Sequence, residues 1–223
     1  MATLDDLEAA IDALLEHPSG GRRYQLVSRT EPKAYEAYVF GLCLRAVREL
    51  GGVPYLNGIS GAPTPFIFRG GPGQIHGTRR NYGYASFRIG AEDFELHAGV
   101  EFRGSSGMTH ELDVAILRAA DARQCRRELT DPGSAALVAG WECKFYADDL
   151  DKVLGRAFVG LMDDMGTNVR LSGMCSNAES AQLRTYMKPM RRPYAQFLLT
   201  PARASNEATF VGLLKATLEK LAG

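Results

Sequence analysis

Three segments in the middle of the chain alternate apolar and polar residues, and this alternation constrains the fold more than any other feature. They are residues 94–103, 110–116 and 137–146. Successive side chains of a β-strand point to opposite faces of the sheet, so each segment predicts a strand with one buried face. Three such strands so close together in the chain predict a sheet at the centre of the molecule.

Helical patterns flank these strands. Thr3 is a favourable N-cap for the first helix, because acidic residues follow it in the first turn. Apolar residues recur at helical spacing over residues 3–17, 33–50, 149–165 and 206–221. We also expect strands at 170–175 and 194–200, short strands or hairpins in the Gly- and Pro-rich stretch 51–86, and a connection with a strong turn signal at 118–136. This order predicts a mixed α/β sheet layered with helices.

The bulk properties fit one globular domain spanning residues 1–223. The chain has 223 residues, of which 45% are apolar and 23% charged. It has no apolar run of transmembrane length, and its acidic, amphipathic start is unlike a signal peptide, so a cytoplasmic location is the default expectation. The four cysteines form no C-x-x-C pair, which favours free thiols over a zinc site.

The formal net charge is zero, so any contact with nucleic acid must come from local basic patches. Two stretches without acids, 69–90 and 184–203, are rich in arginine and lysine. Each patch is explained equally well by a solvated loop and by a contact with nucleic acid. Our candidates for phosphate contacts are Arg79, Arg80, Arg191 and Arg192.

Charged residues interrupt two of the central strands. Asp113 lies in the second strand, and Glu142 and Lys144 lie two residues apart in the third, so that they project from one face. If the two strands are neighbours, both carboxylates come close together and repel, and a divalent cation such as Mg²⁺ relieves this repulsion. A lysine beside it can orient or activate water and balance charge during phosphodiester hydrolysis. The alternative is a solvated strand face with a cross-strand salt bridge.

Asp113 and the motif Glu142-Cys143-Lys144 resemble the PD-(D/E)xK nuclease superfamily, the restriction-endonuclease-like proteins. The resemblance covers about residues 33–200 and implies an αβββαβ core, a mixed sheet flanked by helices. Leu112 stands where many members have proline. The resemblance further implies that Asp113 and Glu142 hold Mg²⁺, which Mn²⁺ can replace, together with the peptide carbonyl of Cys143.

The same resemblance places a further acid on the first core helix. Glu36 fits that position best and would complete the metal shell or position water, whereas Glu49 is a weaker candidate at the end of the helix. Glu111 is either an additional ligand or an exposed strand residue.

The implied activity is cleavage of DNA by an endonuclease, in restriction or antiphage defence. Either the protein cuts DNA with low specificity, or residues 51–88, a partner or a second copy in a homodimer supply the recognition of the DNA sequence. The apolar stripe Phe210, Leu214 and Leu218 of the last helix serves either such a dimer or the chain's own core. The alternatives are a catalytically silent nucleic-acid-binding module with the same fold, or a nuclease that acts on RNA.

Overall fold

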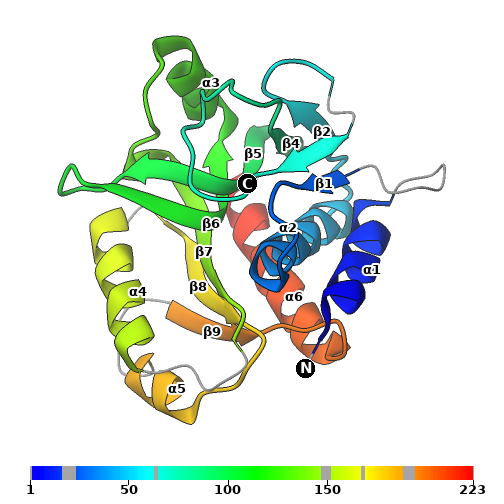
Figure 1. The fold of residues 1–223 in the computed structure, drawn as a ribbon. Coiled ribbons are helices and arrows are strands. Elements are labelled where there is room, and N and C mark those ends of the chain that lie inside the picture. The colour runs from blue at the N-terminus through cyan, green and yellow to red at the C-terminus, as the bar shows by residue number, and fades with distance from the viewer. Residues whose placement is uncertain are drawn as a thin grey trace.

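A mixed β-sheet with helices on both faces forms the body of the protein (Figure 1). The computed structural model describes residues 2–16, 24–62, 65–146, 152–166, 169–187 and 194–222. Within these residues, seven strands form one sheet in the order β2 (Tyr55–Gly58), β4 (Gly83–Ile89), β5 (Glu92–Arg103), β6 (Thr109–Arg118), β7 (Leu137–Lys144), β8 (Leu171–Ser176) and β9 (Tyr194–Leu198). Neighbouring strands from β2 to β7 are antiparallel, and β7, β8 and β9 are parallel.

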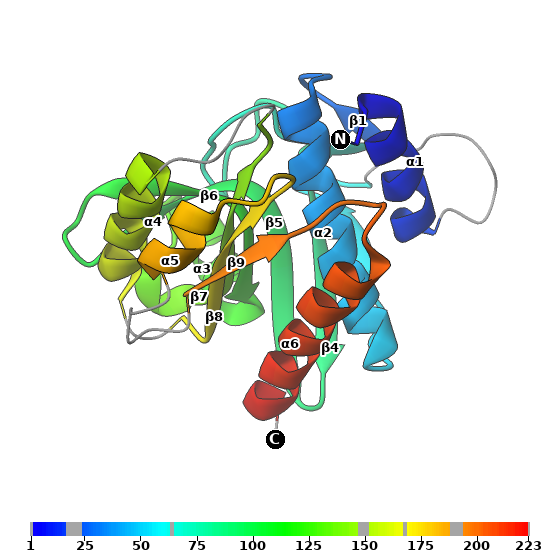
Figure 2. The ribbon, with the colours of Figure 1, turned by 90° about the horizontal axis from the view of Figure 1, so that it is seen from below.

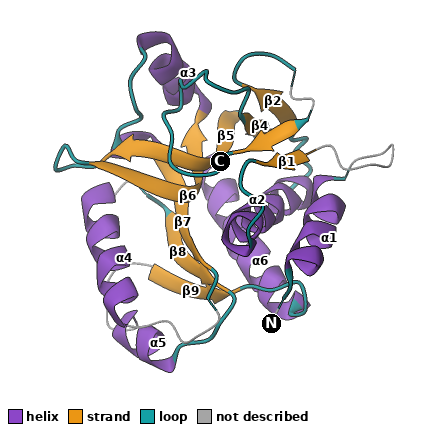
Figure 3. Ribbon diagram, viewed as in Figure 1, coloured by secondary structure: helices purple, strands orange, loops and turns teal. Residues whose placement is uncertain are grey.

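Two layers of helices cover the sheet (Figures 2 and 3). One face packs against α1 (Leu4–Leu15), α2 (Glu31–Glu49) and α6 (Ala204–Ala222). The other packs against α3 (Ala119–Glu128), α4 (Lys152–Met165) and α5 (Ala181–Met187). A short parallel pair, β1 (Tyr24–Leu26) and β3 (Phe66–Phe68), completes the first face, and a single 3₁₀ turn (Ser134–Ala136) leads into β7.

The central helix of the first layer is α2. A proline in its first turn and Glu31 at its start favour helix initiation there, and Gly51 ends it with a positive φ of 77°. Because α1, α6 and the sheet enclose it, its buried residues run around most of its circumference. This burial fixes where its few polar side chains point, which matters for Glu36.

Most of the predicted elements are confirmed. The four predicted helices correspond to α1, α2, α4 and α6, and the predicted strands to β5, β6, β7, β8 and β9. Thr3 caps α1 in a capping box with Asp6. The predicted start of the third helix, near residue 149, lies outside the described residues. Among the described helices, none is both long and apolar enough to cross a membrane.

The last helix packs on the chain's own core. Phe210, Leu214 and Leu218 are fully buried, and the Phe210 ring lies 5.3 Å from that of Trp141. The stripe on α6 is therefore occupied within the molecule, and the hypothesis that it forms a dimer interface is wrong.

Two expectations need correction, one about the connection between two strands and one about the faces of the strands. Residues 118–136 are not only a connection, because they contain α3, whose Arg126 binds the buried Glu95 of β5 through two hydrogen bonds of 2.6 and 2.7 Å. The helix has few apolar residues, and long-range ion pairing rather than an apolar stripe holds it against the sheet.

The second correction concerns the faces of β5 and β6. Leu96 and Val100 have even numbers and should share a face, yet Leu96 belongs to the core under α2 and Val100 to the core under α4. On β6, Leu112 and Val114 are divided in the same way. The faces exchange near Gly99, which has a φ of 59° that favours glycine. Strict alternation therefore fails beside Asp113.

Candidate active site

Strands β6 and β7 separate at the position of Asp113. They are paired from Leu117–Leu137 to Val114–Trp141, and beyond that point β6 continues beside β5 while β7 continues beside β8. The Asp113 carboxylate lies in the opening, where its Oδ2 accepts a hydrogen bond from the Cys143 backbone N–H over 2.6 Å. A side chain thus replaces the backbone acceptor that a continuous ladder would supply, and it ties the two strands together where they diverge.

Glu142 and Lys144 flank this contact on β7. The Lys144 ammonium donates a hydrogen bond to Glu142 Oε1, and about a fifth of each side chain is exposed. Burial raises the pKa of Glu142, and the charge of Asp113 raises it further. Burial acts to lower the pKa of Lys144, but the neighbouring Glu142 carboxylate outweighs it, so the pKa is raised. Lys144 is therefore a cation that can donate hydrogen bonds.

Glu36 approaches Asp113 from α2. Burial raises the pKa of Glu36 to about 8, and the charge of Asp113 adds to this effect. Lys33, one helical turn earlier, partly offsets the shift by donating to both carboxylate oxygens, over 2.6 and 2.9 Å. Because Asp113 acts on both Glu36 and Glu142, the helix and the strand each bring one carboxylate to it. Glu36, Glu142 and Lys144 therefore all lie within electrostatic range of Asp113, and their joint role as a site stays a prediction.

Glu111 adds a fourth carboxylate. Its Oε1 is buried and has no hydrogen-bond partner among the described residues. Burial raises the pKa of Glu111 to about 7, and Asp113 raises it in the same direction. A buried acceptor oxygen without a donor is costly, so this atom has the capacity to accept a cation or a proton donor.

A cleft of about 330 Å³ opens between this part of the sheet and α4. Glu111, Glu142 and Lys144 line one side, together with His110. The other side is formed by Leu154, Ala157, Phe158 and Leu161 of α4. The proposed catalytic motif on β7 therefore faces an accessible space.

The chemistry of the donor set fits a hard divalent cation, since Glu36, Glu111 and Glu142 are all within electrostatic range of Asp113 and one Glu111 oxygen is without a partner. Within the described residues, however, no three His, Cys, Asp or Glu side chains converge closely enough to hold an ion as they stand. In the structure, Glu36 pairs with Lys33 and Glu142 pairs with Lys144. To bind a common cation, these two carboxylates must exchange a lysine for the metal.

The remaining predicted residues are distributed differently. The Cys143 thiol is buried in the core under α2, and the predicted metal contact of its carbonyl stays a prediction. Glu49 lies away from the cluster, where it pairs with Arg45 and Lys215 of the surface, so its candidacy is wrong. Trp141 is a fully buried core residue, as expected.

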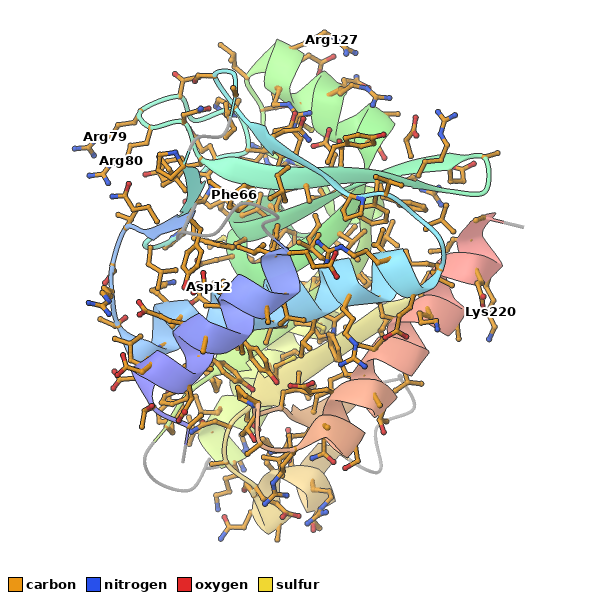
Figure 4. The ribbon with its side chains drawn as sticks, turned by 90° about the vertical axis from the view of Figure 1, so that its right-hand side faces the viewer. Asp12, Phe66, Arg79, Arg80, Arg127 and Lys220 are labelled. Atoms are coloured by element: carbon orange, nitrogen blue, oxygen red, sulfur yellow. The ribbon has the colours of Figure 1, made fainter. Side chains whose placement is uncertain are left out.

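The basic patches are only partly available. Arg79 and Arg80 are exposed and point away from the body of the protein (Figure 4). By contrast, Arg69 is buried against the Tyr82 ring, and Arg88 pairs with Asp93. Arg191 and Arg192 lie outside the described residues.

Two residues beside the cluster were missed by sequence reasoning. Lys33 precedes Glu36 by three positions, a spacing that places both on one helix face and could have indicated the pair. His110 binds Asp164 of α4 over 2.5 Å, and no sequence signal predicts this contact because it depends on the tertiary fold.

Comparison of the chain with protein-family models, curated proteins and solved structures gave no significant match.

Proposed function

We propose that this protein is a divalent-metal-dependent nuclease. The observation that carries the proposal is the placement of Asp113 where β6 and β7 separate, with Glu142 and Lys144 beside it on β7. A strand opening that gathers carboxylates and a lysine beside an accessible cleft is costly to build, because buried like charges repel. Binding of a cation and an anionic phosphodiester offsets that cost.

The order of elements supports an αβββαβ core of the restriction-endonuclease type. After α2 and the strands β2 to β4 come the antiparallel strands β5, β6 and β7, with α3 between β6 and β7. They are followed by α4 and by β8, which is parallel to β7. In this assignment Asp113 lies on the second core strand and the E-x-K motif on the third.

Asp113 and Glu142 would hold Mg²⁺ or Mn²⁺, with Glu36 and the Cys143 carbonyl as further ligands and Glu111 as an additional acceptor. When bound, the cation supplies electrophilic activation of a phosphodiester and of water. Lys144 leaves Glu142 and donates hydrogen bonds to the non-bridging phosphate oxygens, where negative charge increases during attack. Its raised pKa favours this electrostatic role over proton abstraction. Lys33, which donates to both oxygens of Glu36 in the structure, would have to release that carboxylate for it to bind the cation.

DNA is the proposed substrate and restriction or antiphage defence the proposed setting, both from the resemblance of the motif. Arg79 and Arg80 are proposed to contact the phosphate backbone, which carries no sequence information. A homodimer or a recognition partner would supply a second site or specificity.

The proposal is tested by cleavage of plasmid DNA, linear DNA and RNA in the presence of Mg²⁺, Mn²⁺ or EDTA. The wild type is compared with Lys144→Ala and with Arg127→Ala, an exposed arginine of α3. We expect metal-dependent cleavage of DNA that is lost in Lys144→Ala and retained in Arg127→Ala. Cleavage of RNA alone would favour an RNA nuclease. No cleavage of either, with nucleic acid still bound, would favour a silent binding module.

A further inference from the structure

The cleft beside Glu142 and Lys144 has two chemically different walls. The sheet side carries His110, Glu111, Glu142 and Lys144. The α4 side carries apolar residues at positions i, i+3, i+4 and i+7 of one helix, which therefore lie on one face: Leu154, Ala157, Phe158 and Leu161. Its volume of about 330 Å³ is at the lower end of the range for ligand cavities.

Contacts at the end of α4 fix the apolar wall. The Asp164 carboxylate accepts hydrogen bonds from Ser105 Oγ, from the N–H and Oγ of Ser106 and from His110 Nε2, over 2.5–2.9 Å. The Asp164 carbonyl accepts a fifth from the Ser105 N–H over 2.7 Å. A Cβ at Gly104 would clash with Asp164, so the chain comes as close as glycine allows. Figure 1 shows the β5–β6 hairpin reaching over this end of α4.

The dimensions of the cleft limit what can enter it. A B-form duplex is wider than its own major groove, which alone measures about 12 Å. A duplex therefore cannot enter a cleft of about 330 Å³ between the sheet and α4, whose end is held by the β5–β6 hairpin. A paired base also keeps its faces stacked inside the duplex. An unpaired base exposes a flat apolar face, which proteins bind on apolar and aromatic side chains.

We propose that the substrate is single-stranded nucleic acid or an unpaired strand end. One nucleotide enters the cleft with its phosphate toward Lys144 and its base against Leu154 and Leu161 of α4. This inference rests on the proposed nuclease function and adds the substrate class to it. The apolar wall offers no hydrogen bonds to base edges, so the preference for unpaired bases is not accompanied by strong sequence preference.

The experiment compares hydrolysis of three substrates with Mn²⁺: a single-stranded DNA oligonucleotide, the same sequence as a duplex, and bis(p-nitrophenyl) phosphate, a small diester without a base. An RNA strand of the same sequence distinguishes the two kinds of nucleic acid. The variants are Leu154→Gln and Leu161→Gln, both half-buried in the wall, with Val153→Gln as the matched control on the exposed side of α4. Circular dichroism checks that each variant is folded.

We expect the wild type to cleave the single strand at least about tenfold faster than the duplex. In Leu154→Gln and Leu161→Gln, KM for the single strand should rise about fivefold or more, because the base loses its apolar contact. Val153→Gln should behave as the wild type, and the wild type should hydrolyse the small diester. Equal or faster cleavage of the duplex, or an unchanged KM in both wall variants, would overturn the inference while leaving the nuclease function intact. Failure of the wild type to hydrolyse even the small diester would overturn the proposed function itself.

Discussion

Asp113 has a structural and a proposed chemical role at once. Its carboxylate receives the Cys143 N–H in the opening between β6 and β7, and its charge acts on Glu36, Glu111 and Glu142. These two roles are separable, because the hydrogen bond needs only an acceptor oxygen whereas cation binding needs the negative charge.

Two substitutions at Asp113 should separate the roles. Asp113→Asn keeps an acceptor for the Cys143 N–H but removes the charge, whereas Asp113→Ala removes both. We expect metal-dependent cleavage to fall by at least about a hundredfold in both variants. Only Asp113→Ala should also lose stability, by about 1–3 kcal/mol, because a buried N–H is left without a partner. Activity assays and urea unfolding test this, and full activity in Asp113→Asn would show that the charge is not used.

The residues of the site were largely predictable, but their faces were not. Asp113, Glu142 and Lys144 stand out in the sequence because charge interrupts apolar strands. The exchange of faces at Gly99 and the gap between β6 and β7 depend on backbone conformations that alternation does not encode. Lys33 was missed because its role depends on which carboxylate faces it.

Among the elements, α3 shows where local pattern fails. Its sequence has few apolar residues, and it is fixed to β5 by the ion pair of Arg126 with Glu95, which is distant in the chain. His97 also contacts Glu95, over 3.0 Å, and stacks on the Tyr84 ring. The helix is therefore held by polar interactions in a buried setting, which short-range periodicity does not predict.

The Glu95 ion pair should make stability depend on acid. Burial would raise the pKa of Glu95, but hydrogen bonds from Arg126 and His97 overcome it and lower the pKa to about 2. A lowered pKa contributes stability above the ordinary value near 4.5, and this contribution is lost as the pH falls toward 2. We expect Glu95→Gln to be less stable than the wild type at pH 6 by roughly 3 kcal/mol, and this difference to disappear near pH 2. Urea unfolding across this range measures it; a difference that does not change with pH would contradict the assignment.

The contact between α4 and the β5–β6 hairpin should depend on Asp164. Replacing it with alanine removes all four hydrogen bonds to its carboxylate, so residues 104–108 should become more sensitive to proteases. The matched control is Asp163→Ala, whose exposed side chain precedes it. Limited proteolysis followed by mass spectrometry locates the cuts. Equal cleavage rates at the hairpin in both variants would show that Asp164 does not hold it.

For the whole molecule, the neutral net charge means that nucleic-acid binding must rely on a few local cations. Arg79 and Arg80 are exposed and lie apart from Arg127 on α3 (Figure 4). The sequence indicated these arginines, but it did not show that Arg69 and Arg88 of the same patch serve the fold. The order of the seven strands in the large sheet also depends on contacts far apart in the chain, so the type of sheet was predictable but its strand order was not.

Salt dependence should reveal the contribution of the two arginines. The double substitution Arg79→Ser with Arg80→Ser should reduce the slope of log K against log salt concentration by about 1–2, since each phosphate contact contributes about 0.7–0.9. Arg127→Ser should leave the slope unchanged. Fluorescence anisotropy with a labelled oligonucleotide measures the slope, and an unchanged slope in the double variant would exclude this loop from the interface.

Binding of Mn²⁺ is the measurement that tests the central claim most directly. Electron paramagnetic resonance of free Mn²⁺, titrated with the wild type and with Glu142→Gln at neutral pH, reports binding without a substrate. We predict that the wild type removes Mn²⁺ from solution, and that Glu142→Gln, which keeps the size of the side chain but loses its charge, binds at least about tenfold more weakly. Wild-type protein that leaves Mn²⁺ free, or equal binding by Glu142→Gln, would contradict a metal site formed by Asp113 and Glu142.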